Sequence, residues 1–465
     1  MAAFRLFAVL ATVFMPCLAL AHVSSQVFTM LLPTDLYVAG GMMTVVLTLA
    51  WLWAAGDRAY RLFEPRIKAP TRSSSHSRRD HLPTWRAGLG LALWSALIFV
   101  GLFGPHGPRD NLLPVFFWEV FWPCAVVVAP VWTTVGKWLD PWNGALRLLQ
   151  RLGVRAGRSR LRRRWRGVPA CISAVAVALY MLADLSPNDP SRLAVALLIY
   201  GGIHLLGAVA FGRRWLLFGE AFGLTLALVS RLRILTRRGG RRHWQWPGTD
   251  LVRRRQPAVG HGLLVLTTLA IGSFDSLNET FWWLAKLKIN PLLVPGRSAL
   301  ARSNAVATIL SPGLVLILFA SLVWSGAQWA KLPLSRATLS TLAISCLPIA
   351  WGYHLAHYAS VAMVGYQYLL VGISDPFGTG LNWLGLDRHF VSTGFFFTPS
   401  SARRLFELQA AAVVVGHALS LVMAHAVTTQ WAGQRERVFR ASLPLALFMV
   451  IYTLFGLWLL ASPKA

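Results

Sequence analysis

Apolar runs of about 20 residues recur along this chain, and clusters of arginine separate several of them. A run of this length crosses the hydrocarbon core of a bilayer as one helix. Backbone in hydrocarbon must satisfy its own hydrogen bonds, which favours helices. Hydrophobic residues make up 55% of the 465 positions and charged residues only 13%, a balance too apolar for a soluble domain of this length. The sequence therefore predicts an all-α fold, a polytopic transmembrane helix bundle.

The apolar runs predict about ten crossings. They lie near Leu36–Ala55, Ala87–Phe103, Leu112–Val135, Val168–Leu185, Leu193–Phe211, Val259–Phe274, Ala305–Trp324, Leu339–Val364, Phe406–Val427 and Ala441–Leu460. A further apolar piece, Trp215–Ser230, is short and has arginines on both sides. We expect it to form a re-entrant or interfacial helix. Glu220 is expected to bond the adjacent arginines, and the alternative is that it gates an inward cavity.

The net charge of +28 is concentrated in loops between the apolar runs. Basic residues accumulate on the cytoplasmic side of a membrane protein, so the arginine-rich loops near 56–86, 136–167 and 231–256 are predicted to be cytoplasmic. There they would contact anionic lipid headgroups. We expect no role in binding nucleic acid.

The first residues have the pattern of a secretory signal. Arg5 precedes the apolar stretch Leu6–Met15, and Ala19-Leu20-Ala21 forms an A-x-A cleavage site. The prediction is a signal peptide over 1–21 and one transmembrane domain over 22–465, with a periplasmic N-terminus in a bacterial inner membrane. An uncleaved first span is the alternative. Cleavage would leave His22 with a free α-amino group, a pair that can chelate copper.

Three histidines, His354, His357 and His417, lie inside predicted crossings. An ionisable side chain within the membrane is costly and needs a partner, so it indicates a functional site. His354 and His357 are three residues apart and share a helix face, and His417 is expected at a similar depth. Three imidazoles suit a divalent metal, with zinc or copper the expected choice. His204 is a weaker fourth candidate.

Carboxylates near the same depth could complete such a site. They are Glu119, Asp275, Glu279 and Asp375, with Asp375 or Asp275 as the fourth ligand or the general base. Asp375 could instead cap the turn that follows its span. Two other interpretations stay open for the histidines: each hydrogen-bonds a neighbouring helix, or together they relay protons.

Several motifs resemble those of the bacterial membrane proteins labelled fenitrothion hydrolase. The resemblance covers most of the chain in the same order and is carried by Asn111 to Trp122, Asp140-Pro141-Trp142, Phe218 to Phe222, Ala356-His357-Tyr358 with Ser374-Asp375-Pro376, and Gly416-His417 through Ala424-His425. It implies hydrolysis of the aryl ester bond of a lipophilic organophosphorus triester, releasing a nitrophenol. It carries no catalytic residues over to this sequence. Members of that family often lack a carboxylate at the Glu119 position and a histidine at the His204 position, so these two residues rank below His357 and His417.

Together these observations predict a membrane-embedded hydrolase of organophosphorus triesters, with a lipophilic small molecule as substrate. A metal-activated hydroxide is the expected nucleophile, since histidines and carboxylates can hold the metal that produces it. Two alternatives remain: a transporter whose histidines bind a metal ion or small molecule, and a membrane assembly factor whose arginine loops dock a partner.

Overall fold

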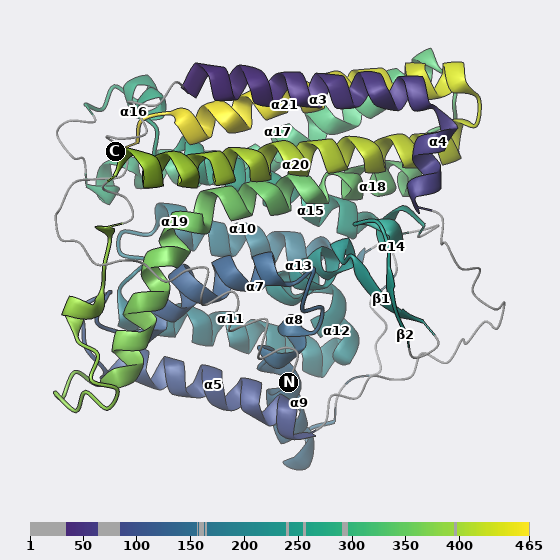
Figure 1. The fold of residues 1–465 in the computed structure, drawn as a ribbon. Coiled ribbons are helices and arrows are strands. Elements are labelled where there is room, and N and C mark those ends of the chain that lie inside the picture. The colour runs from purple at the N-terminus through teal and green to yellow at the C-terminus, as the bar shows by residue number, and fades with distance from the viewer. Residues whose placement is uncertain are drawn as a thin grey trace.

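A computed structural model describes residues 34–63, 84–155, 157, 162, 165–238, 241–253, 257–290, 296–394 and 398–464. The predicted signal peptide over 1–21, His22 and much of the predicted 56–86 loop lie outside these residues. The described chain is a bundle of helices with one short hairpin of strands (Figure 1). This confirms the predicted all-α polytopic fold.

Eight described segments are long and apolar enough to cross a membrane, so the chain is a multi-pass membrane protein. They are α3 (Thr34–Ala55), α5 (Thr84–Phe103), α11 (Pro190–Phe211), α15 (Val259–Leu277), α17 (Arg297–Trp329), α18 with α19 (Arg336–Ser345 and Leu347–Ser374), α20 (Pro399–Ala432) and α21 (Arg435–Ala461). Three of them, α11, α18 and α20, begin at a residue whose side chain caps the first turn. In α20, for example, Thr398 accepts a hydrogen bond from the Ser401 N–H and Pro399 occupies the first turn.

Two other predicted crossings coincide with shorter apolar helices. One is continuous over Leu112–Val128 and combines α6 (Leu112–Pro114), the π-helical segment η2 (Val115–Phe121) and α7 (Trp122–Val128). The other is α10 (Val168–Ala183), whose 16 residues rise about 24 Å, less than the roughly 30 Å hydrocarbon core. The prediction of a run to Val135 was wrong because Pro130 follows the last turn, and a proline disfavours helix at the residue before it.

The piece expected not to cross is split into two short helices, α12 (Arg213–Phe218) and α13 (Ala221–Val229). Neither is long enough to span a bilayer. The hairpin of β1 (Leu235–Arg238) and β2 (Arg241–Trp244) follows, antiparallel, with Leu235 opposite Trp244. The remaining short helices are α4 (Asp57–Tyr60), η1 (Arg61–Phe63), α8 (Val135–Trp138), α9 (Trp142–Arg151), η4 (Ser230–Leu232), α14 (Thr249–Val252), α16 (Phe281–Lys286) and η6 (Arg388–Phe390).

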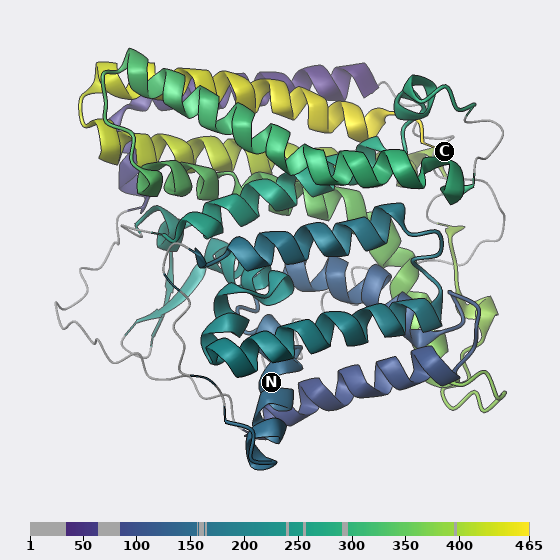
Figure 2. The same cartoon turned by 180° about the vertical axis from the view of Figure 1, so that it is seen from behind.

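The long helices lie roughly side by side, with α3, α17, α20 and α21 along one edge of the bundle and α5 along the other (Figures 1 and 2). Helices α10, α13 and α15 lie between these edges. The β1–β2 hairpin marks one end of the bundle, here called the hairpin end, and the C-terminus lies at the opposite end, here called the tail end. Helix α19 starts beside α15 and α20 and then turns across the tail end.

Side-chain burial separates the lipid-facing surface from the interior. Leu314 and Ile317 on α17 and Ile451 on α21 are about two-thirds exposed, as expected for residues that face lipid tails. Inside, Gly352 on α19 faces Gly416 on α20, and a Cβ at Gly416 would lie 2.6 Å from the Pro348 carbonyl oxygen. Small residues at such a contact let two helix backbones approach closely. This approach fixes the first half of α19, which carries His354 and His357.

Candidate functional site

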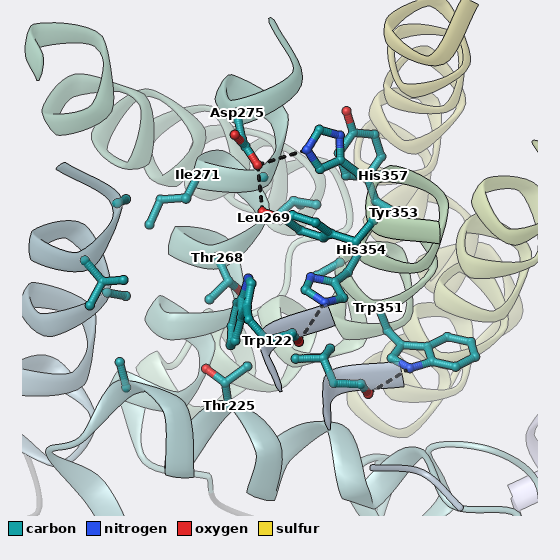
Figure 3. A pocket seen from close by; sticks show the side chains of 18 of the residues that line it. Trp122, Thr225, Thr268, Leu269, Ile271, Asp275, Trp351, Tyr353, His354 and His357 are labelled. Atoms are coloured by element: carbon teal, nitrogen blue, oxygen red, sulfur yellow. Dashed lines mark hydrogen bonds and ion pairs between the residues drawn. The ribbon is translucent and has the colours of Figure 1, made fainter. Parts of the chain in front are cut away.

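A buried serine, histidine and aspartate are joined by hydrogen bonds where the end of α15 meets α19. Ser276 Oγ lies 2.7 Å from His357 Nδ1, and His357 Nε2 lies 3.0 Å from Asp275 Oδ2. The Tyr358 hydroxyl donates to the same Asp275 oxygen at 2.8 Å. Figure 3 shows Asp275 and His357 pointing toward each other across this contact. We call Ser276, His357, Asp275 and Tyr358 the serine–histidine cluster.

The partners decide which nitrogen of neutral His357 carries the proton. An ionised carboxylate only accepts hydrogen bonds, so the proton of a neutral ring resides on Nε2 and is donated to Asp275. Nδ1 then presents its lone pair to the Ser276 hydroxyl. This is the relation that activates the nucleophile in serine hydrolases, although there the serine usually faces Nε2 and the carboxylate faces Nδ1. Either nitrogen can act as the base, so the chemical roles are the same.

A cavity of about 280 Å³ opens beside Ser276, between the serine–histidine cluster and the C-terminal residues. We call it the tail cavity. Its polar lining is Ser276, Glu279, His357, Ser360, Gln409 and Lys464, and its apolar lining includes Val361, Leu405, Phe406 and Leu460. Lys464 Nζ pairs with Glu279 Oε2 at 3.2 Å, which holds the chain end over this cavity. A lipophilic molecule with one polar group fits such a lining.

A second cavity, of about 110 Å³, lies on the other side of His357. We call it the aromatic cavity. Its ring-bearing lining residues are Trp118, Trp122, Phe222, Trp351, Tyr353, His354, His357 and Tyr358, and Asp275 also lines it. Figure 3 shows Asp275 and His357 at one side of this cavity and Thr225 at the other. Tyr353 and His357 line both cavities, so they form the wall between them.

His354 lies in the aromatic cavity but bonds a different partner from His357. Its Nε2 is 3.2 Å from the Trp122 carbonyl oxygen, which joins α19 to the residue after the π-helical segment η2 (Figure 3). Since a carbonyl only accepts, Nε2 carries the proton. Departures from α-helix of this kind often accompany functional sites.

His204 is held in a separate network near the α12–α13 break. The Trp215 indole N–H donates to His204 Nδ1 at 3.1 Å, and His204 Nε2 lies 3.0 Å from Ser173 Oγ. Both ring nitrogens are therefore occupied. The network continues from Ser173 to the Tyr200 hydroxyl and from there to Glu220.

The hydrogen-bond partners of Glu220 are not the ones that the sequence predicted. Its carboxylate accepts hydrogen bonds from the Tyr200 hydroxyl and from the backbone N–H groups of Phe222 and Gly223 at the start of α13. The expected bonds to adjacent arginines are not made among the described residues, because the side chain caps a helix inside the bundle.

The predicted three-histidine metal site is not assembled. His417 Nδ1 bonds the Val413 carbonyl on its own helix at 2.8 Å, and its Nε2 is buried without a partner. Both nitrogens of His357 and of His204 are hydrogen-bonded within the part of the chain that the structure describes. Within the described residues, no group of three or more histidine, cysteine, aspartate or glutamate side chains is placed to hold a metal ion. Equal depth does not by itself bring side chains of different helices together, so a bound metal stays a prediction.

Two predicted carboxylates also lie away from the serine–histidine cluster. Glu119, on η2, packs against Gly365 of α19 and lines neither cavity. Asp375 caps the turn after α19, accepting from Thr379 N at 2.9 Å and Gly380 N at 2.6 Å. Partial desolvation raises the pKa of Asp375, but these backbone donors outweigh it and the net pKa is lowered. The turn-capping interpretation therefore describes Asp375.

Ser276 and Tyr358 were not singled out by the sequence reasoning. A signal for Ser276 exists, since it follows Asp275 directly within the last turn of an apolar helix. Comparison of the chain with protein-family models, curated proteins and solved structures gives no match. The function of this chain is therefore inferred from the chemistry of the site.

Proposed function

We propose that this chain is a membrane-embedded hydrolase of lipophilic esters, with organophosphorus triesters among its substrates. The observation that carries the proposal is the hydrogen-bonded order Ser276–His357–Asp275 beside the tail cavity. The sequence resemblance described above points to the same class of reaction and stays a prediction.

The residues have distinct roles in this reaction. Ser276 Oγ attacks the phosphorus or carbonyl centre of a substrate in the tail cavity, and its proton moves to His357 Nδ1. The leaving alkoxide or aryloxide then takes that proton from Nδ1. A water molecule hydrolyses the seryl ester by the reverse sequence, which regenerates Ser276. Asp275 orients the ring and stabilises the imidazolium. Tyr358 donates a hydrogen bond to Asp275, which stabilises the ionised form of this carboxylate.

The residues fit this mechanism better than they fit a metal-activated hydroxide. His357 uses Nε2 on Asp275 and Nδ1 on Ser276, so it has no free lone pair for a metal. No step is therefore assigned to a metal.

The location of the site suits a substrate that partitions into the bilayer. Ser276 is the second-last residue of α15, close to the end of its span, and Val361 in the cavity lining is exposed on the surface of the bundle. We place the tail end on the periplasmic side of a bacterial inner membrane, because the arginine-rich segments belong to the hairpin end.

The test is turnover of a chromogenic aryl phosphotriester by purified protein in a neutral detergent. Wild type should release the nitrophenol with saturation kinetics. His357→Gln and Asp275→Asn should each lose at least about 10³-fold in kcat/KM, as removal of a base or its orienting group does. His204→Gln is the matched control, since it changes a buried histidine outside the serine–histidine cluster and should keep wild-type turnover. Equal losses in all three variants would contradict the proposal.

A histidine-lined transporter is the second candidate, and one observation favours it. The break between α12 and α13 carries a buried carboxylate, Glu220, and broken helices of this kind form binding sites in many transporters. A transporter would need sealed vesicles and a gradient to show activity, whereas the hydrolase works in detergent.

A further inference from the structure

The aromatic cavity has a chemical character of its own, separate from the tail cavity. Its walls are mainly apolar and aromatic, and they come from η2, α7, α10, α13, α15 and α19. One buried water needs about 10–15 Å³ of such space, so about 110 Å³ admits a small organic molecule.

The lining of the aromatic cavity carries a negative charge and no lysine or arginine. Asp275 is the carboxylate among the lining residues, and neither lysine nor arginine is among them. Asp275 is only 7% exposed, and both hydrogen bonds described above reach its Oδ2 atom, leaving Oδ1 without one among the described contacts. When His357 is neutral, no positively charged side chain of the cavity lining faces this carboxylate, since Lys464 and Arg297, which interact with it electrostatically, are not lining residues. A buried carboxylate in apolar surroundings is costly, so a cation in the cavity would be stabilised.

Aromatic faces supply the second half of a cation site. Trp122 packs edge-on against Phe222 at 5.2 Å and against His354 at 5.2 Å between ring centroids, which makes one continuous wall of rings. The negative face of an aromatic ring attracts a cation, most strongly for tryptophan, and aromatic cages recognise quaternary ammonium groups in this way. His354 adds an unprotonated Nδ1, which can accept a hydrogen bond from an N–H group.

We propose that the aromatic cavity binds a small organic cation, a protonated or quaternary amine, through Asp275 and the surrounding rings. The cation lies on the Asp275 side of His357, while Ser276 opens onto the opposite side. The site therefore needs Asp275 but not Ser276. It stands independently of the proposed hydrolysis, although the two share one carboxylate.

The experiment is titration of the purified protein in a neutral detergent with tetramethylammonium chloride, followed by tryptophan fluorescence and calorimetry. Sodium chloride controls for ionic strength, and tert-butanol is a neutral molecule of similar size. Wild type should bind tetramethylammonium saturably and bind tert-butanol weakly. Asp275→Asn should weaken binding at least tenfold, and Trp122→Leu should weaken it by about tenfold.

Ser276→Ala separates this proposal from the hydrolase. It should lose ester turnover and still bind tetramethylammonium within about twofold of wild type. Binding lost in Ser276→Ala but kept in Asp275→Asn would overturn the cation site. So would equal binding of tert-butanol, or no saturable binding by wild type. If Asp275→Asn fails to fold, Trp122→Leu decides alone, because unchanged affinity there contradicts the aromatic contribution.

Discussion

Ser276 and Ser273 can each be replaced by alanine to separate catalysis from stability. We predict that Ser276→Ala loses more activity, whereas Ser273→Ala is at least as destabilised. Both serines are buried on α15, three residues apart on one helix face. Ser276 bonds His357, whereas Ser273 bonds the Tyr452 hydroxyl on α21. Each variant therefore loses side-chain hydrogen bonding from the same helix, and only one of them loses the proposed nucleophile.

The stability changes follow from what each partner faces afterwards. In Ser276→Ala, His357 Nδ1 borders the tail cavity, whose 280 Å³ can admit water, so the loss should be about 1 kcal/mol. In Ser273→Ala, the Tyr452 hydroxyl is left in packed surroundings, and an unsatisfied buried group costs about 1–3 kcal/mol. Unfolding in mixed micelles should show Ser273→Ala to be at least as destabilised as Ser276→Ala.

Activity should follow the reverse order. Loss of the nucleophile should lower kcat/KM by about 10³-fold or more, which corresponds to about 4 kcal/mol of transition-state stabilisation. Ser273→Ala should stay within about threefold of wild type, since it touches neither His357 nor Asp275. If both variants lose activity in proportion to their stability, Ser276 has a structural role and the reasoning is refuted.

Three further outcomes follow from the same contacts. Trp215→Phe removes the donor to His204 Nδ1, so the free energy of unfolding should fall by about 1–3 kcal/mol with ester turnover unchanged; lost turnover would link this network to catalysis. The lowered pKa of Asp375 means that its turn is stabilised above the ordinary aspartate pKa of about 4 and loosens as pH falls through the lower folded value. Hydrogen exchange of Thr379 and Gly380, corrected for intrinsic rates, should be fast at neutral pH in Asp375→Asn but only in strong acid in wild type; equal rates would contradict the cap. Dialysis against a chelator should leave turnover unchanged, because His357 has no lone pair left for a metal, and activity lost and then restored by zinc would disprove this.

The bundle itself was readable from the sequence, because the length of an apolar run is set by the thickness of the bilayer. The short Trp215–Ser230 piece was also identified as too short to cross, and it folds as α12 and α13. The apolar runs did not predict where a helix is interrupted or changes direction. The π-helical segment η2 and the turn of α19 across the tail end depend on packing against neighbours, which hydropathy does not encode.

The candidate site shows the same limit. The sequence singled out His357 and Asp275, since a charged side chain in an apolar span demands a partner, and the structure places these two side chains in contact. Their other partners were not predicted, because depth along a helix says nothing of rotation about its axis. His417 turns to its own helix backbone and His204 to Trp215, while Ser276 and Tyr358 complete the cluster.

The most direct test of the central claim is covalent trapping of the nucleophile. An activated aryl phosphonate should phosphonylate a serine hydrolase at its nucleophile and release one equivalent of phenol. Peptide mass spectrometry of the labelled protein should place one adduct on Ser276, and His357→Gln should greatly slow its formation. An enzyme that turns over phosphotriesters while Ser276 stays unmodified, or an adduct on a residue away from the tail cavity, would contradict the account.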